Sequence, residues 1–193
     1  MHALKDLEES EIVVLNPNDK RSRRVQRWRA YEQGESLPLV CATIPIIGTD
    51  KVVELFRSPK KRVMPSEWIF FLSEHQKASD DSARTALERG FKEEVGYDLR
   101  RKRLFDPDER INLRYKSIDC RRHLLWKAGL YVVPIIRLSE LTPDQDEILD
   151  IRERPLEEVL RDVYKKGSPY KRFNPEKFFK TLEKHTRYIM ENI

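Results

Sequence analysis

Short runs of apolar and β-branched residues recur along the chain and predict the strands of a sheet. The runs are Leu37–Ile47, Lys51–Arg57, Trp68–Leu72, Ile111–Ile118 and His123–Leu138. Gly48–Asp50 separates the first two runs with a turn signal, so we expect these runs to form a hairpin. Trp68–Leu72 is apolar throughout, which is typical of a strand buried on both faces.

One segment, Ser79–Val95, has the periodicity of an amphipathic helix. Its apolar residues recur at every fourth position, which predicts a single buried stripe formed by Ala83, Leu87, Phe91 and Val95. Ser79 or Asp80 is expected to cap the N-terminus, and Gly96 stands where a left-handed C-terminal cap belongs. Two later helices are predicted, each with a proline in its first turn, at Pro155–Lys166 and Pro175–Met190.

The order of strands, helix, strands and helices predicts an α/β fold in which helices cover a sheet. The length of 193 residues suits one domain, which we place at residues 37–193, with residues 1–36 as an N-terminal extension that carries a basic segment. No apolar run is long enough to span a membrane, and Met1–Ser10 is too polar for a secretory leader. The only cysteines, Cys41 and Cys120, form no metal-binding pattern. We therefore expect an intracellular protein, cytoplasmic by default, with no membrane partner.

Charged residues are abundant and clustered. The chain has 38 Lys and Arg against 33 Asp and Glu, a net charge of +5, and its basic clusters predict an anionic partner, either a polyphosphate or a nucleic acid. The candidate substrate-binding residues are Arg23 and Arg24, from the basic segment Lys20–Arg29, together with Lys60, Lys61 and Arg62 from a basic loop. The alternative is a solvated charged surface, which for Lys20–Arg29 is an amphipathic helix.

Several common kinds of site are missing from the sequence, which has no glycine-rich phosphate loop, no histidines at metal-ligand spacing and no nucleophile elbow. What remains is a group of carboxylates at the end of the predicted helix. They lie in the segment Arg89-Gly90-Phe91-Lys92-Glu93-Glu94-Val95-Gly96-Tyr97. This segment resembles the second half of the Nudix box, Arg-Glu-φ-x-Glu-Glu-x-Gly-φ, in which φ is aliphatic or aromatic. The flanking segments, from Leu37 to Lys166, resemble the core strands, closing loop and helix of that family.

The resemblance implies a Nudix-like α/β/α sandwich with a mixed sheet. It also implies a Mg²⁺ or Mn²⁺ ion held by Glu93 and Glu94, with Glu147 as a downstream ligand, and a catalytic set of Glu93, Glu94 and Arg89. Such an ion orients an attacking water and neutralises the charge that develops on a pyrophosphate, while Arg89 positions the carboxylates. The structural alternative is a solvated last turn with a surface ion pair between Arg89 and Glu93.

The sequence departs from the box at three positions. Gly90 replaces the glutamate that follows the arginine, Asp81 replaces the upstream glutamate, and His75 replaces the opening glycine. Glu88 points about 100° away from Arg89 around a helix, so it is a poor substitute for the missing carboxylate. We therefore expect Gly90→Glu to raise hydrolysis and to stabilise the helix slightly.

Two functions of different classes follow from the resemblance. The first is a metal-dependent hydrolase, of reduced or altered activity, that cleaves a pyrophosphate linkage in a nucleotide, a dinucleoside or inositol polyphosphate, or an RNA 5′ end. The second is a catalytically decayed module that binds RNA, a nucleotide or a protein partner through its basic surface. Turnover that depends on Glu93 distinguishes the first function from the second.

Overall fold

The computed structural model describes residues 12–15, 23–61, 63–100, 102, 104–105, 110–116, 123–173 and 176–193. Its strands are β1 Ile12–Leu15, β2 Arg23–Gln26, β3 Ser36–Thr43, β4 Lys51–Arg57, β5 Trp68–Ile69, β6 Phe71–His75, β7 Arg110–Lys116, β8 His123–Val132 and β9 Ile148–Pro155. They form a four-stranded sheet in the order β6-β3-β8-β7, a three-stranded sheet in the order β5-β4-β9, and the ribbon β1-β2. The four-stranded sheet is mixed, because β3 is parallel to β8 and antiparallel to β6.

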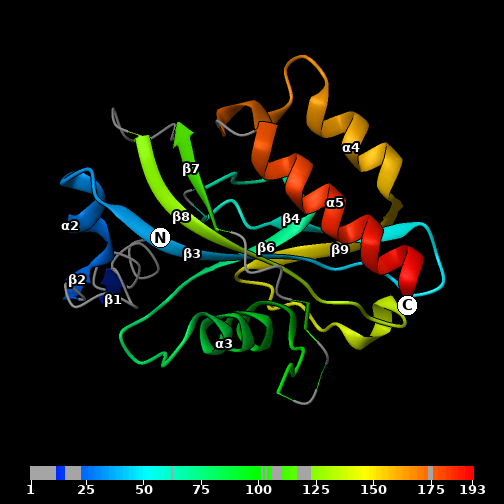
Figure 1. Ribbon diagram of the computed structural model, residues 1–193, viewed down its shortest axis with the longest axis horizontal. Coiled ribbons are helices and arrows are strands. Elements are labelled where there is room, and N and C mark those ends of the chain that lie inside the picture. The colour runs from blue at the N-terminus through cyan, green and yellow to red at the C-terminus, as the bar shows by residue number, and fades with distance from the viewer. Residues whose placement is uncertain are drawn as a thin grey trace.

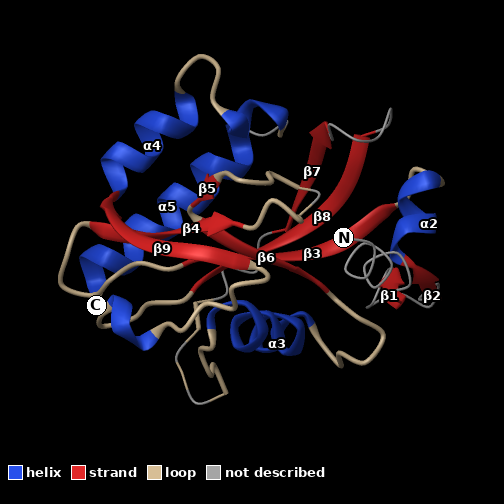
Figure 2. Cartoon of the chain, turned by 180° about the vertical axis from the view of Figure 1, so that it is seen from behind, coloured by secondary structure: helices blue, strands red, loops and turns tan. Residues whose placement is uncertain are grey.

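Helices cover the strands on two sides. The α-helices are α2 Arg27–Glu32, α3 Ala83–Val95, α4 Leu156–Tyr164 and α5 Glu176–Asn192. Helix α3 lies on one side of the strands, and α4 and α5 lie on the other (Figure 1). The view from behind shows the same separation, with β9 and β4 beneath α4 and α5 (Figure 2). This arrangement is the α/β/α sandwich with a mixed sheet that the sequence predicts.

Each helical layer buries its own apolar group. On the side of α3, Leu87, Phe91 and Val95 are fully buried, whereas Ala83 at the start of the helix is only partly buried against the core. The predicted stripe is therefore confirmed over three of its four positions. On the side of α5, aromatic rings fill the space, with neighbouring ring centroids 5.1 to 6.4 Å apart. These rings belong to Phe70, Phe71, Phe173, Phe178 and Phe179.

The ends of α3 are fixed by two different caps. The N-cap is Ser82, whose hydroxyl oxygen accepts a hydrogen bond of 3.1 Å from the Thr85 amide, so the prediction of Ser79 or Asp80 is wrong by two or more residues. At the other end, Gly96 has φ +64°. This left-handed cap is confirmed, and it ends the helix one residue after Glu93 and Glu94.

The predicted hairpin is confirmed only next to the turn. There Pro45 and Val52 form an antiparallel bridge, Ile46 N–H donates to Lys51 O (3.0 Å) and Val53 N–H donates to Ile44 O (2.9 Å). Beyond it the two strands separate, because β3 and β4 belong to different sheets. The predicted strand Trp68–Leu72 likewise divides between the sheets, since β5 pairs with β4 and β6 pairs with β3. The chain thus crosses from one sheet to the other at Phe70. Strand β6 then ends at His75, the position that corresponds to the opening glycine of the box.

Other boundaries also differ from the predictions. The strand predicted over His123–Leu138 ends at Val132, and β9 is not predicted at all. Pro155 is the N-cap of α4 and not a residue of its first turn, while Pro175 and Ile118 lie outside the described residues. Strand β9 matters for the site, because it follows directly after Glu147.

The N-terminal segment combines a strand pair and a short helix. Lys20–Arg29 is not one amphipathic helix, since Arg23–Gln26 forms β2 and α2 begins at Arg27. Val13, Ala30 and Tyr31 are buried in the same cluster as the rest of the core. The domain boundary at residue 37 stays a prediction. None of the helices in the described ranges has the length and apolar character that a bilayer crossing requires.

Candidate functional site

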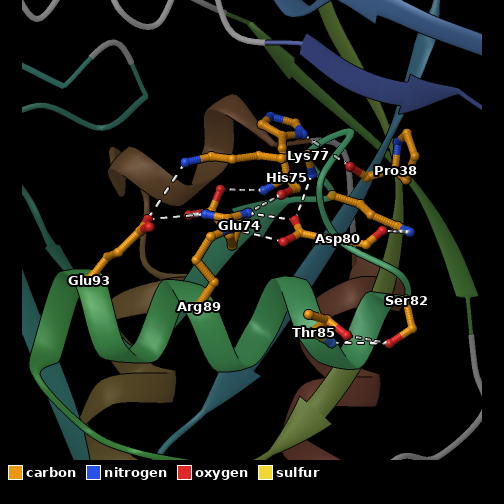
Figure 3. Close-up of polar contacts among 10 residues, drawn as sticks. Pro38, Glu74, His75, Lys77, Asp80, Ser82, Thr85, Arg89 and Glu93 are labelled. Carbon is orange, nitrogen blue, oxygen red and sulfur yellow. Dashed lines mark hydrogen bonds and ion pairs between the residues drawn. The ribbon is translucent and has the colours of Figure 1, made fainter.

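Arg89 is the central residue of a polar network between α3 and the end of β6 (Figure 3). Its Nε and Nη2 donate to the two oxygens of Asp80 (3.1 and 2.9 Å), and Nη2 also donates to the His75 carbonyl (2.8 Å). Its Nη1 lies 3.1 Å from Glu93 Oε2 and 3.1 Å from Glu74 Oε2. Arg89 thus contacts the carboxylates of Asp80, Glu74 and Glu93, and its role in positioning catalytic carboxylates stays a prediction. The predicted Arg89–Glu93 pair exists, but it is one part of a larger network.

Arg89 pairs with Asp80 and not with Asp81, the residue that replaces the upstream glutamate of the box. Asp80 forms a bidentate ion pair with Arg89, and its side chain is only 4% exposed, whereas Asp81 is exposed. Asp80 also accepts a hydrogen bond from the Lys77 amide (2.7 Å), which folds the loop before α3. Burial alone would lower the pKa of Arg89, but the hydrogen bond to Asp80 and the charges of Glu74 and Asp80 outweigh it and raise that pKa.

The C-terminal end of α3 brings a second loop to the box. The carbonyl groups of Glu94 and Val95, which have no partner within the helix, accept hydrogen bonds from the amides of Asp144 (2.9 Å) and Thr142 (2.8 Å). Within this loop the amide of Glu147 donates to Asp144 O (3.0 Å). The backbone therefore holds Glu147 beside the last turn of α3, next to Glu94.

A third segment reaches the same place from the end of β4. Ser58 N–H donates to Glu147 O (3.0 Å), and Lys61 N–H donates to Ser58 O (3.1 Å). This turn carries the ammonium of Lys61 between two carboxylates: it contacts Glu147 and lies 3.8 Å from Glu94 Oε1. Lys61 is only 13% exposed, so this basic side chain is part of the site and not of the outer surface.

Strand β6 adds a carboxylate that the sequence analysis missed. Glu74 lies opposite Gly90, and a Cβ added at Gly90 would lie 3.0 Å from Glu74 Cβ and Cγ and 3.4 Å from Oε2. The Glu74 side chain is 12% exposed. By contrast, Glu88 pairs with Arg84 (2.9 Å) on another face of α3, as helix geometry predicts. No signal in the sequence connects Glu74 to Gly90.

One cavity of about 560 Å³ lies where α3, β6 and the two loops meet. One part of the wall is acidic, with basic side chains among the carboxylates; it includes Glu74, Glu93, Glu94, Asp144, Glu147 and Lys61. The other part is largely aromatic and includes Trp28, Tyr31, Phe71, Trp126 and Phe173. A cavity with charged groups in one part and flat apolar rings in the other can hold a molecule that joins phosphates to a planar group.

The aromatic part of the wall contains a buried hydrogen-bond chain. Trp126 Nε1–H donates to Tyr31 Oη (2.6 Å), and Tyr31 Oη is 2.7 Å from His75 Nε2. His75 Nδ1 lies 3.0 Å from the Pro38 carbonyl, which can only accept, so Nδ1 carries the hydrogen and Nε2 accepts from Tyr31. Burial, followed by the charge of Arg27, lowers the pKa of His75 to about 3. The imidazole is therefore neutral at ordinary pH.

The donor chemistry of the acidic wall fits a divalent cation. Glu94 Oε2 is buried and has no hydrogen-bond partner among the described residues, and the Glu94 side chain is 7% exposed. Carboxylate oxygens are the ligands that Mg²⁺ and Mn²⁺ prefer. Within the described ranges, however, no three metal-ligating side chains are gathered as a group that could hold an ion. The carboxylates are instead held by Arg89, Lys61 and Lys77, the last 3.6 Å from Glu93 Oε2.

The structure places the predicted substrate-binding residues in different parts of the molecule. Lys61 lines the cavity, whereas Lys60 contacts Asp146 outside it. Arg23 and Arg24 are exposed on β2, where Arg23 contacts Glu35. Arg62 lies outside the described residues. A role for these five residues in substrate binding stays a prediction, and only Lys61 is brought together with Glu93, Glu94 and Glu147.

No protein-family model and no curated protein matches the sequence. The structure is similar to that of DR0079 from Deinococcus radiodurans, with a TM-score of 0.57 and 13% identity over 79% of this chain and 88% of that one. It is also similar to a MutT protein from Methanosarcina mazei (TM-score 0.51, 16% identity, 78% and 96% of the two chains). An Ap4A hydrolase from C. elegans gives a TM-score of 0.50 at 15% identity over 78% and 97%. The chain therefore has the fold of the Nudix hydrolases.

Proposed function

We propose that this protein hydrolyses a phosphoanhydride bond in a phosphorylated small molecule of the nucleotide type. One observation carries the proposal: Glu94 Oε2 is buried without a hydrogen-bond partner among the described residues, in a cavity that Glu93 and Glu147 also line. Leaving such an oxygen unpaired costs about 1 to 3 kcal/mol. A Mg²⁺ or Mn²⁺ ion would offset this cost, and Glu93, Glu94 and Glu147 are the residues that would hold it.

The residues around the cavity have distinct roles in this proposal. Arg89 is fixed by Asp80 and by the His75 carbonyl, and it orients the Glu93 carboxylate toward the cavity. Lys61 contacts Glu147 and lies near Glu94, and its ammonium would pair with phosphate oxygens of a bound substrate. The rings of Trp28 and Tyr31 pack against the planar part of the substrate. When bound, the cation polarises the phosphoanhydride and activates a water.

The similarity to an Ap4A hydrolase makes dinucleoside polyphosphates the first substrates to test. Nucleotide sugars, inositol pyrophosphates and triphosphorylated RNA form the rest of the panel, each assayed with Mg²⁺ and with Mn²⁺. The variants are Glu94→Gln, which removes a cavity carboxylate, and Glu88→Gln, which removes a carboxylate paired with Arg84 elsewhere on α3. We expect turnover in the wild type and in Glu88→Gln, and its loss in Glu94→Gln.

A second candidate, a binding module without turnover, is favoured by one feature of the same site. Lys61 already contacts Glu147 and approaches Glu94, and Arg89 and Lys77 already pair with Glu93. If the wild type binds a member of the panel but hydrolyses none of them, and Glu94→Gln binds it equally well, this second function is correct. In that case the basic side chains and the aromatic wall alone hold the ligand.

A further inference from the structure

Helix α3 and strand β6 face each other at Gly90 and Glu74, where a residue without a side chain lies opposite one with a long side chain. Gly90 is on the buried side of α3, and a Cβ there would come within 3.0 Å of Cβ and Cγ of Glu74. Contacts of this length are tighter than most packed Cβ contacts, so a side chain at position 90 would require the Glu74 side chain to move by a few tenths of an ångström. Glycine in a helix costs about 1 kcal/mol relative to alanine, and the position of Glu74 explains why the chain has it here.

The Glu74 carboxylate is held firmly at this point. Its Oε1 accepts a hydrogen bond of 2.7 Å from the His75 amide, and its Oε2 is 3.1 Å from Arg89 Nη1. The same nitrogen is 3.1 Å from Glu93 Oε2, so one guanidinium group brings the carboxylates of β6 and α3 together (Figure 3). Glu74 also lines the cavity together with Glu93 and Glu94.

We propose that Glu74 supplies, from strand β6, the carboxylate that α3 lacks at Gly90. Glu74 then acts with Glu93 and Glu94 on the divalent cation, either directly or through a water bound to the cation. This inference rests on the function proposed above. It explains how the site keeps its acidic character although the box has lost one glutamate.

A chain that has Glu74 and also carries Gly90→Glu should lose stability. A glutamate at position 90 would crowd Glu74 and place a further negative charge beside it, where Arg89 already contacts the three carboxylates of Glu74, Asp80 and Glu93. This crowding argues against the expectation from sequence that Gly90→Glu alone stabilises the helix, and its effect on hydrolysis stays a prediction. We expect that single variant to be less stable than the wild type, and the exchange Glu74→Gly with Gly90→Glu to be tolerated.

The test is a calorimetric titration of the full chain with Mn²⁺. The variants are Glu74→Gln, Glu94→Gln, the exchange variant Glu74→Gly/Gly90→Glu, and the control Glu88→Gln. We expect Glu74→Gln to weaken Mn²⁺ binding at least about tenfold, the scale of loss seen when a group that supports a metal site is removed. The exchange variant should recover affinity to within a few-fold of the wild type, and Glu88→Gln should match the wild type.

A purely structural role for Glu74 predicts a different pattern. In that case Glu74→Gln lowers the melting temperature but leaves the Mn²⁺ affinity of the folded protein unchanged, which would overturn the proposal. An exchange variant that folds but does not recover affinity would also overturn it. If Glu74→Gln does not fold, Glu74→Asp replaces it, since it keeps the charge beside Arg89 and withdraws the carboxylate by one methylene; wild-type affinity in Glu74→Asp counts against the proposal.

The same titration separates this proposal from the proposed function. If Glu94→Gln loses Mn²⁺ binding and Glu74→Gln retains it, the cation site stands and only the role of Glu74 is wrong. If the wild type itself binds no Mn²⁺ at millimolar concentration, the metal-dependent function is wrong, and the role of Glu74 is wrong with it.

Discussion

Gly96 is the residue at which the end of α3 meets the loop that carries Glu147, and we expect its replacement by alanine to damage both the fold and the site. Its φ of +64° is unfavourable for any residue with a Cβ. A Cβ at this position would also overlap the hydroxyl of Thr142 and lie 2.7 Å from the Thr142 carbonyl oxygen. The oxygen cannot move far, because the Thr142 amide is bonded to Val95 O (2.8 Å).

The free energy of unfolding that Gly96→Ala loses is the sum of two costs. The left-handed conformation costs a residue with a Cβ about 1 to 2 kcal/mol, and forcing extra volume into a packed contact costs roughly 1 to 3 kcal/mol. Gly167 provides a matched control, because its φ is +82° but nothing lies within 4 Å of an added Cβ. Gly167→Ala should therefore show only the first cost, and Gly96→Ala should lose about 1 to 3 kcal/mol more.

Urea unfolding of the wild type and of both variants measures these costs. Combining Gly96→Ala with Thr142→Ala should recover only part of the loss, since the backbone oxygen of Thr142 remains in place. Mn²⁺ affinity should fall in Gly96→Ala and not in Gly167→Ala, because only the first change shifts the loop that holds Glu147 beside Glu94. Equal losses of stability in the two alanine variants would refute the packing argument.

Three further changes test separate contacts. The pKa of His75 in the folded protein is lowered to about 3, so between about pH 6.5 and 3 only the unfolded chain binds a proton at this imidazole. On acidification below pH 6.5 in EDTA, His75 should therefore cost the wild type about 1.4 kcal/mol of stability per pH unit. His75→Gln should remove that slope, and parallel pH curves for the two proteins would contradict it. Arg89→Lys should cost roughly 2 kcal/mol in urea unfolding, because lysine cannot form both bonds to Asp80; an unchanged midpoint would argue against the network. Lys61→Met should tighten Mn²⁺ binding in calorimetry by removing the cation that competes for Glu94, and unchanged affinity would disprove that contact.

The sequence was most informative where local rules act alone. The four-residue spacing of Leu87, Phe91 and Val95 identified α3, and the left-handed cap at Gly96 followed from its position at the end of that stripe. Strand β4 was predicted with its bounds intact, at Lys51–Arg57. These features depend on neighbours in the chain, so one sequence suffices to predict them.

Pairing between distant segments could not be predicted in the same way. The turn at Gly48–Asp50 is real, but β3 is buried on both faces and pairs with β6 and β8 instead of β4. Strand β9 has three aliphatic residues, Ile148, Leu149 and Ile151, which do not alternate regularly with its charged ones, and its burial is correspondingly partial. A strand of this kind is identified by its partner β4 and not by its own pattern.

The candidate site shows the same division. Glu93 and Glu94 were identified from the box, and the structure brings both to one cavity with Glu147 and Lys61. Asp80 was missed in favour of Asp81, because the loop between β6 and α3 shifts the acidic position by one residue. Such a shift changes no local pattern, so only the three-dimensional partner of Arg89 reveals it.

Glu74 differs from these cases, because its importance depends on what another residue lacks. Its own sequence context is a short strand end, and a glutamate there is ordinary by any local rule. Gly90, taken alone, indicates a lost ligand and a weakened helix. Only the 3.0 Å that would separate a Cβ at position 90 from the Glu74 side chain shows that the absence of one side chain makes room for the other. A carboxylate placed on β6 is also held by the pairing of Val40 with Glu74 between β3 and β6, so its position depends on sheet register, whereas Glu93 and Glu94 depend on the helix. The cation site proposed here is therefore assembled from two elements, and a change that moves α3 relative to the sheet should weaken it without removing any ligand.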